Sequence, residues 1–432
     1  MTSKLPVSPL APKKTPRLPK LAGVRLATAA TGSRYQGRDD LMLMHFAPTT
    51  TMAGVFTRSL MPSAAVDLSR LHMANSRGRA AALVVNAGNA NAFTGAAGAK
   101  AAMDMAQGAA AALVCKPAQV YVASTGVIGE DLPTEPLLDG INTIARRFAA
   151  KPRAGFTGHN DHKAWLAAAR AMMTTDTFPK LASQTARLGG KTVTLNGIAK
   201  GSGMIAPDMA TMLAFVVTDA AIPARVLQSL LAQANETSFN AITVDGDTST
   251  SDTCLLFATG VHALGGAPLR SANDKRLAGF KKALHALMQD LAVQTVSDGE
   301  GASKLMVIDI AGAEADAAAR RSGLCVGNSP LVKTAVAGED ANWGRIVMAV
   351  GRSGELAERD RLAIDIGGVP VARRGRAVKG YDEKPVARHM RGHRIEIKIS
   401  VGAQGGKGKG RARIWASDLT HGYISINADY RS

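Results

Sequence analysis

The sequence is poor in aromatic residues, and it has no long uninterrupted apolar run. Aromatic residues make up 4% of the 432 residues, although 46% of all residues are hydrophobic. The longest apolar stretch, residues 204–222, is broken by Pro207, Asp208 and Asp219. A membrane-spanning helix needs roughly 18 or more apolar residues in succession. The sequence therefore excludes a membrane span and predicts a globular protein with one large core or two ordinary ones.

Cysteine is also scarce. Cys115, Cys254 and Cys325 are odd in number and far apart, which fits neither a disulfide framework nor a zinc ribbon, so we expect them to be reduced and mostly buried. The N-terminus is basic and rich in proline but lacks the apolar segment of a secretory signal, and its prolines prevent the amphipathic helix of a transit peptide. We expect a cytoplasmic protein in which residues 1–21 form a flexible tail.

Acidic residues are fewer than basic ones, 34 against 52, which gives a net charge of +18. The basic excess lies in the first 38 residues and in residues 373–413. Neither stretch carries the aromatic pair, zinc finger or basic heptads of a nucleic-acid-binding domain. We therefore expect a solvated surface and a cationic field near a site for anionic substrates, with no nucleic acid as partner. A basic nucleic-acid-binding protein stays the alternative from another class, and it would bind DNA or RNA with steep salt dependence.

Short apolar runs bounded by glycine alternate with helical patterns, which indicates an α+β protein with helices covering sheets. Leucines and other apolar residues recur every 3 to 4 positions over residues 274–294, after a cap at Asn273, and a second helix starts at Ala224. Residues 394–401 and 413–417 flank a glycine- and lysine-rich segment and predict a hairpin. The runs that we interpret as buried strands are 81–85, 120–123, 212–217, 255–258 and 305–310.

Two patterns resemble metal sites without completing one. His389 and His393 are four residues apart, but the glutamate of a metalloprotease motif is missing. Asp245, Asp247 and Asp252 resemble the opening of a calcium loop, but its required glycine and glutamate are absent. We interpret the histidines as structural or exposed and the aspartates as an ordinary polar turn, and we expect no metal.

The most informative segment is the loop that leads into the strand predicted at 212–217. Thr211 stands where glycines and a proline give way to apolar residues. A threonine hydroxyl needs a base to become a good nucleophile. An N-terminal threonine supplies its own base, because the pKa of an α-amine is about 7.7 to 8.0, so that part of the amine is neutral near pH 7 and can take the hydroxyl proton. This chemistry requires that the chain cut itself between Ala210 and Thr211. On composition alone, a threonine that merely starts a strand is the favoured alternative.

The segment 200–213 closely resembles the cleavage and nucleophile motif of the ornithine acetyltransferase family, also called glutamate N-acetyltransferase. The resemblance covers about residues 22–432. It implies a layered αββα sandwich of the self-cleaving N-terminal nucleophile kind, with a smaller C-terminal α/β region. It also implies an α chain of residues 22–210 and a β chain of residues 211–432, paired as a heterotetramer of two α and two β chains. Further matching stretches are 84–92, 123–129, 173–177, 298–304, 338–345 and 427–432.

The same resemblance implies transfer of an acetyl group from N2-acetyl-L-ornithine to L-glutamate through acetyl-Thr211, with Thr125 and Gly126 as the oxyanion hole. No cofactor is implied, and whether acetyl-CoA also serves as a donor, which would make the enzyme bifunctional, is left open. A self-cleaving aminopeptidase or amidase of similar fold is the alternative. The substrate contacts implied by the resemblance are Thr174, Lys200, Thr211, Glu300, Asn427 and Ser432.

The division of roles among these residues is our inference from their charges. Lys200 suits a substrate carboxylate and Glu300 an ammonium group. We expect Gly126→Ala to fold but to slow acetylation, because its methyl group would intrude beside the oxyanion. Deletion of residues 427–432 should raise the KM for acetylornithine while leaving the cut intact.

Overall fold

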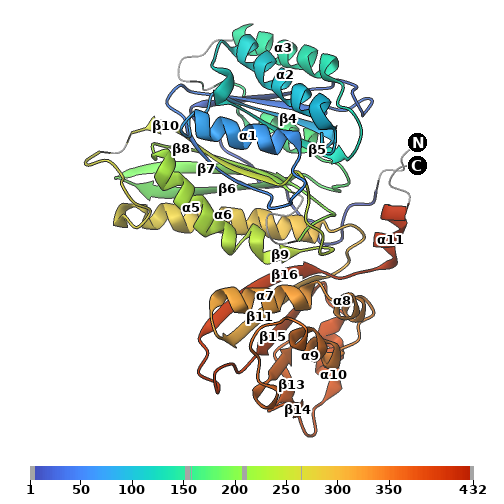
Figure 1. Cartoon of the computed structure of the whole chain (residues 1–432). Helices are drawn as coiled ribbons and strands as arrows, with labels where there is room; N and C mark the ends of the chain where they lie inside the picture. Colours follow the sequence, from blue (N-terminus) through green and yellow to red (C-terminus); the bar gives the residue numbers. More distant parts are fainter. Residues whose placement is uncertain (1–4, 151–155, 157, 207–211, 264, 429–432) are drawn as a thin grey trace.

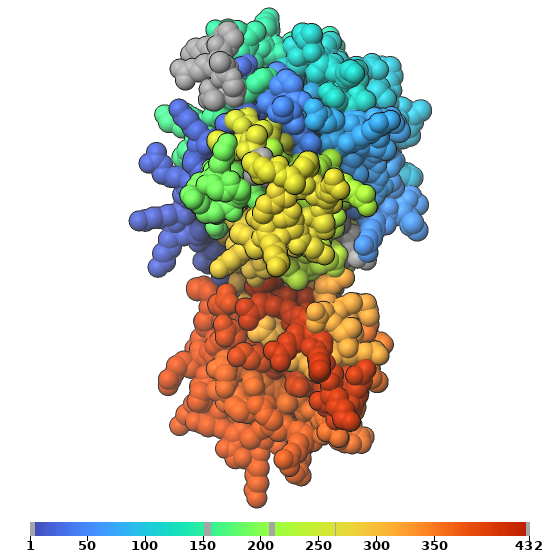
Figure 2. All heavy atoms as spheres, turned by 90° about the vertical axis from the view of Figure 1, so that its left-hand side faces the viewer, coloured from blue at the N-terminus to red at the C-terminus, as the bar shows by residue number. Residues whose placement is uncertain are grey.

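The computed structural model describes residues 5–150, 156, 158–206, 212–263 and 265–428. Figure 1 shows a body of two stacked sheets with helices on its outer faces, and a C-terminal lobe below it. Figure 2 shows the same division from the side, where the orange and red lobe meets the body at a narrower junction.

Two sheets form the centre of the body. In the first sheet β4 and β5 run parallel and the other neighbours antiparallel; in the second only β10 and β8 run parallel. The first sheet has the order β1 (Val24–Ala29), β2 (Leu41–Phe46), β4 (Ala82–Asn89), β5 (Val120–Val127). The second has the order β3 (Thr51–Phe56), β10 (Thr253–His262), β8 (Leu213–Ala220), β7 (Lys191–Lys200), β6 (Lys180–Leu188).

Helices cover the outer face of each sheet (Figure 1). Helices α2 (Gly95–Leu113) and α3 (Thr134–Ala150) pack on the first sheet, and α5 (Ala224–Glu236) and α6 (Ala278–Ser297) pack on the second. Helices α1 (Ala64–Asn75) and α4 (His162–Ala171) add apolar side chains to the core between the sheets. This is the αββα arrangement that we expected, and the prediction is confirmed.

Strand β8 shows why the central strands carry apolar residues at consecutive positions. Its side chains alternate, so that Phe215 and Val217 point into the core between the sheets, whereas Ala214 and Val216 pack toward α5 and α6. A strand covered on both faces needs apolar residues at every position rather than at every second one. The same holds for β4, in which every residue is buried.

Each predicted strand overlaps an observed one, with the runs 81–85 and 212–217 starting one residue before β4 and β8, and Ala224 begins α5 as expected. The predicted helix over 274–294 starts with a 3₁₀ turn, η4 (Lys275–Leu277), and continues as α6. Its cap differs from the prediction, because the side chain that accepts from the backbone is Asp274, bonded to Arg276 N, and not Asn273. A shift of one residue at a helix end is common where the first turn is 3₁₀.

The C-terminal lobe is built on a third, seven-stranded sheet. Its helices are α7 (Asp316–Gly327), α8 (Pro330–Ala337), α9 (Trp343–Gly351) and α10 (Glu383–Met390), and α11 (His421–Ala428) follows the last strand. Short 3₁₀ turns with described bounds lie at η1 (Pro117–Gln119), η3 (Phe239–Ala241) and η5 (Arg359–Arg361). The strand order is β14 (Arg376–Ala377), β13 (Val369–Arg373), β12 (Ala363–Ile366), β15 (Arg394–Ser400), β11 (Leu305–Ala313), β16 (Gly410–Ser417), β9 (Ile242–Thr243).

The hairpin predicted from residues 394–401 and 413–417 is wrong. β15 and β16 do not pair with each other, because β11 lies between them, parallel to β15 and antiparallel to β16. β11 is largely apolar and gains cover from a neighbour on each side. The connecting segment 401–409 is long enough to pass one intervening strand, since neighbouring strands are about 4.8 Å apart.

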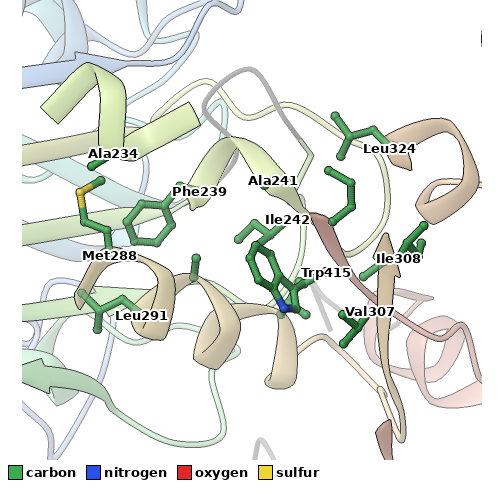
Figure 3. Close-up of a cluster of buried hydrophobic side chains, with 14 of the residues drawn as sticks. Ala234, Phe239, Ala241, Ile242, Met288, Leu291, Val307, Ile308, Leu324 and Trp415 are labelled. Atoms are coloured by element: carbon green, nitrogen blue, oxygen red, sulfur yellow. The ribbon is translucent and has the colours of Figure 1, made fainter. Parts of the chain in front are cut away.

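The lobe and the body share one apolar core. Figure 3 shows its side chains at the junction, where Phe239 and Met288 of the body lie near Ile242 and Trp415. Strand β9 contributes to this junction directly, because residues 242–243 leave the body and pair with β16. The lobe is therefore joined to the body by packing as well as by the chain.

The N-terminal segment packs on the body in the part that the structure describes. Leu18 and Leu21 are buried, Ser8 Oγ donates to Ser297 O at 2.6 Å, and Asn196 Nδ2 donates to Pro19 O at 2.8 Å. Residues 8–21 thus cover the body rather than extend from it, although they form no helix or strand. Sequence reasoning weighed the prolines and charges and gave too little weight to the two leucines.

All three cysteines are free; Cys254 is buried, and Cys115 and Cys325 are partly buried. Across the described ranges, no helix combines the length and the apolar character needed to cross a bilayer.

Candidate active site

One cavity of about 250 Å³ brings six of the predicted site residues together. It lies where β5 and β7 end and where α11 and the segment 249–251 approach them. A larger cavity, of about 760 Å³, lies between α3 and β1 and contains none of the predicted residues. The predicted residues that line the smaller cavity are Thr125, Gly126, Thr174, Lys200, Glu300 and Asn427.

The predicted nucleophile and cut fall outside this description. Ala210, Thr211 and Ser432 are not among the described residues. The neighbouring Met212 is described, and its backbone N–H donates to Asp252 Oδ1 at 3.0 Å, next to Ser251 of the cavity wall. Leu213 is the antiparallel partner of Lys200. The beginning of β8 therefore lies beside the cavity.

Lys200 is a buried cation held by a network behind the cavity. Its side chain is 4% exposed, and its Nζ lies 3.9 Å from Asp176 Oδ2. Asp176 Oδ1 also accepts from Lys180 Nζ at 2.6 Å, and Lys180 reaches Asp298 Oδ2 at 2.6 Å. Burial would raise the pKa of Asp176, but Lys180 and Lys200 hold it below its ordinary value. Burial lowers the pKa of Lys200, although Asp176 opposes this effect.

Thr125 and Gly126 stand at the end of β5. Lys200 Nζ donates to Thr125 Oγ1 at 3.2 Å, which leaves the hydroxyl hydrogen of Thr125 available for another acceptor. Gly126 has φ of +134°, and a methyl group there would lie 2.1 Å from the carbonyl carbon of Gly88. The expectation that Gly126→Ala folds normally is therefore wrong, because the backbone of β4 occupies the space.

Glu300 and Asn427 form the opposite wall. Asn427 Nδ2 donates to Glu300 Oε2 at 2.8 Å, and Glu300 N donates to Ser202 O at 2.9 Å. Glu300 is 8% exposed, and burial raises the pKa of its carboxyl group. A Cβ at position 203 would lie 2.3 Å from Glu300 Oε2, so any residue other than glycine there would displace the Glu300 carboxyl group. The cavity therefore carries a cation on one side and a carboxyl group on the other.

Sequence reasoning missed several residues that build this site. Asp176 and Asp298 lie in stretches that matched the family, but their charges gave no sign that they would pair around Lys180. Asp252 was interpreted as part of an ordinary polar turn, which is wrong, because it is fully buried and binds Met212. Asp245 accepts from Met204 N on the other side of the predicted cut. A buried carboxylate in a polar sequence has no local signature.

The two histidines have structural contacts. His389 Nε2 accepts from Glu396 N at 2.9 Å, and His393 Nδ1 lies 2.9 Å from Ser303 O. Within the described part of the chain, no group of three or more histidine, cysteine, aspartate or glutamate side chains is arranged to hold a metal ion.

Comparison with known proteins identifies the family of this chain. The model of the ArgJ family matches residues 25–432. This chain belongs to the ArgJ family. It is 52% identical over 427 residues to the arginine biosynthesis bifunctional protein ArgJ of Brucella suis biovar 1, covering 99% of each chain. The resemblance identified from the motifs is confirmed, and with it an acyltransferase of arginine biosynthesis, an ornithine acetyltransferase.

Two ArgJ structures are also similar. The arginine biosynthesis bifunctional protein of Bacillus halodurans is 36% identical and matches 50% of this chain and 98% of that chain, with a TM-score of 0.46. The ornithine acetyltransferase of Mycobacterium tuberculosis, solved in complex with ornithine, is 34% identical and matches 43% of this chain and 92% of that chain, with a TM-score of 0.36.

Proposed function

We propose that the chain cuts itself between Ala210 and Thr211 and then transfers acetyl from N2-acetylornithine to glutamate through acetyl-Thr211. The observation that carries the proposal is the cavity beside the start of β8, lined by six residues that the family resemblance had singled out. Met212 N, bonded to Asp252, ties the chain that follows Thr211 to the wall of that cavity.

The acyl transfer needs only groups that this chain supplies. The α-amine of Thr211 takes the hydroxyl proton while Oγ1 attacks the acetamide carbonyl. The hydroxyl of Thr125 and the N–H of Gly126 stabilise the oxyanion that forms. The C–N bond then breaks, ornithine leaves with the proton, and an acetyl ester stays on Thr211. Glutamate reverses these steps, because its amine attacks the ester and Thr211 regains its proton.

The opposite charges of the cavity suit amino-acid substrates. Acetylornithine carries a carboxylate and a side-chain ammonium group, which we assign to Lys200 and Glu300. Thr174, Asn427 and Ser432 complete the proposed substrate contacts. Curated relatives are bifunctional proteins, so we also propose acetyl-CoA as a second acetyl donor to glutamate.

The proposed cut would leave the two fragments associated. It lies between β7 and β8, which pair from Leu195 and Thr218 to Lys200 and Leu213 in the middle of the second sheet. Separating an α chain of residues 22–210 from a β chain of residues 211–432 would expose two strands buried on both faces. We propose that they stay together and assemble as two α and two β chains.

Thr211→Ala tests the proposal directly. On a denaturing gel the wild-type chain should give fragments of 210 and 222 residues, the second number being 432 minus 210. Thr211→Ala should give one intact band and no transfer, because hydroxyl and base act as a unit. Thr211→Ser, which keeps a hydroxyl group, should still be cut. A single intact wild-type band with full transferase activity would refute the proposal.

A further inference from the structure

The segment 243–253, which we call the clamp loop, contacts described residues on both sides of the predicted cut. On the upstream side of the cut, the backbone N–H groups of Met204 and Ile205 donate to the clamp loop: Met204 N to Asp245 Oδ2 at 2.5 Å and Ile205 N to Asp245 Oδ1 at 2.7 Å. Val244 N donates to Ile205 O at 2.8 Å. Ile205 is thus bonded through both its N–H and its carbonyl group to the clamp loop.

Downstream of the cut, the same loop holds Met212. Asp252 Oδ1 accepts from Met212 N at 3.0 Å, and Thr253 N donates to Met212 O at 3.1 Å. Asp252 is fully buried, and burial raises the pKa of its carboxyl group well above the ordinary value. A neutral side chain with one oxygen acceptor is therefore a close substitute for it.

The clamp loop is itself fixed from a third part of the chain. Thr57 Oγ1 donates to Ser249 O at 2.6 Å, Thr57 N donates to Asp252 O at 3.0 Å, and Ser63 N donates to Thr250 O at 2.8 Å. Thr57 follows β3, and Ser63 is the N-cap of α1. The body therefore fixes the distance between Asp245, which contacts the chain before the cut, and Asp252, which contacts the chain after it.

We propose that Asp245 and Asp252 are positioning residues for self-cleavage. They hold Ile205 and Met212, described residues on either side of the predicted cut, in place. Fixing both ends restricts the paths open to the backbone, which favours a geometry in which a hydroxyl group can reach the preceding carbonyl carbon. This inference rests on the proposed function, and it assigns neither aspartate a contact with the reacting atoms.

The two aspartates respond differently to amide substitution, and this difference provides the test. Asp252→Asn keeps one oxygen for Met212 N. Asp245→Asn has one oxygen for three N–H donors, those of Met204, Ile205 and Asp247, and its amide group would face at least one of them. Asp252→Ala removes the acceptor entirely. Asp418→Ala is the matched control, since Asp418 is a buried carboxylate that holds Ser303 and Lys304 at a turn elsewhere.

The full chain of each variant is synthesised, its folding is checked by thermal unfolding, and the rate of cutting per folded protein is followed on denaturing gels. Asp252→Ala and Asp245→Asn should slow cutting about 10-fold or more, because each leaves a backbone N–H beside the cut without its acceptor. Asp252→Asn and Asp418→Ala should cut within about twofold of wild type. Cleaved Asp252→Ala should show a lower kcat with little change in KM, because the aspartate that it lacks holds Met212, the residue after Thr211.

Equal slowing in Asp418→Ala, or in Asp252→Asn and Asp252→Ala, would overturn the inference, since the effect would then reflect general destabilisation or the charge. Wild-type rates in Asp252→Ala and Asp245→Asn would also overturn it and leave the proposed function intact if Thr211→Ala stays uncut. Failure of the wild-type chain to cut would overturn both.

Discussion

The two walls of the cavity are built in different ways. Lys200 and Thr125 form the inner wall, where Asp176 and Lys180 surround the lysine with buried charge. Glu300 and Asn427 form the outer wall, and Asn427 lies on α11, which has no buried residue. Further contacts in the described structure come from the residue before α11 and from α11 itself: Thr420 Oγ1 donates to Gly301 O at 2.6 Å, and the Tyr423 hydroxyl lies 3.3 Å from Asp245 Oδ2.

This difference indicates that the two walls have different roles in the reaction and in substrate binding. Side chains fixed by buried, paired charges are held ready for the reaction, because their reorganisation would be costly. A helix held by a few hydrogen bonds at the surface can order around a substrate at small cost. Changes to the inner wall should therefore lower kcat, and changes to the outer wall should raise KM.

Lys200→Met is expected to have the largest effect. It removes a cation that donates to Thr125 and that we assign to the substrate carboxylate, while it keeps the length of the side chain. Two charge-assisted contacts of about 1.5 to 3 kcal/mol each predict a loss of about 10³-fold in kcat/KM. Steady-state kinetics on folded protein measure it. Lys333→Met, which removes a buried lysine of the C-terminal lobe, is the control and should lose stability rather than activity.

Thr125→Val should lower kcat by about 10² to 10³, the typical loss of one oxyanion donor, with little change in KM. Valine has the shape of threonine, so the strand should keep its packing. Ser124→Ala is the neighbouring control, because Ser124 Oγ donates to Asn86 Oδ1 at 2.6 Å and does not line the cavity. A wild-type kcat in Thr125→Val would show that this hydroxyl group is not part of the oxyanion hole.

The comparison of the walls also shows what the sequence could predict. The strands of the body were predictable because burial on both faces makes them continuous apolar runs, and the family motifs pointed to Thr125, Lys200 and Glu300. The network behind Lys200 could not be predicted, because Lys180 pairs with both Asp176 and Asp298, and the fold brings these separate segments together. The hairpin prediction was wrong for a similar reason, since the strand order depends on which strands pair with β11.

Glu300→Gln should raise the KM for acetylornithine by about 10- to 100-fold and change kcat less, because it removes the charge proposed to bind the ammonium group. Burial raises the pKa of Glu300, so its charged form is lost at a higher pH than that of an exposed glutamate. The wild-type KM should therefore rise on acidification at a pH where an exposed glutamate would still be ionised, and the KM of the variant should stay flat there. Parallel KM curves against pH would contradict this role.

Asn427→Ala is expected to have the smallest effect, because it removes one hydrogen bond to Glu300 and one within an exposed helix. The lost bond to Glu300 Oε2 leaves the carboxyl group in place but less well oriented, which predicts a rise of about 3- to 10-fold in the KM for acetylornithine. Cutting at Thr211 should be unchanged, since the outer wall holds none of the described residues that flank the cut. Ser425→Ala, on the same helix and bonded only to His421 O in the described structure, is the control and should match wild type. If Asn427→Ala lowered kcat and left KM unchanged, the outer wall would take part in the chemistry, and the division between the walls would be wrong.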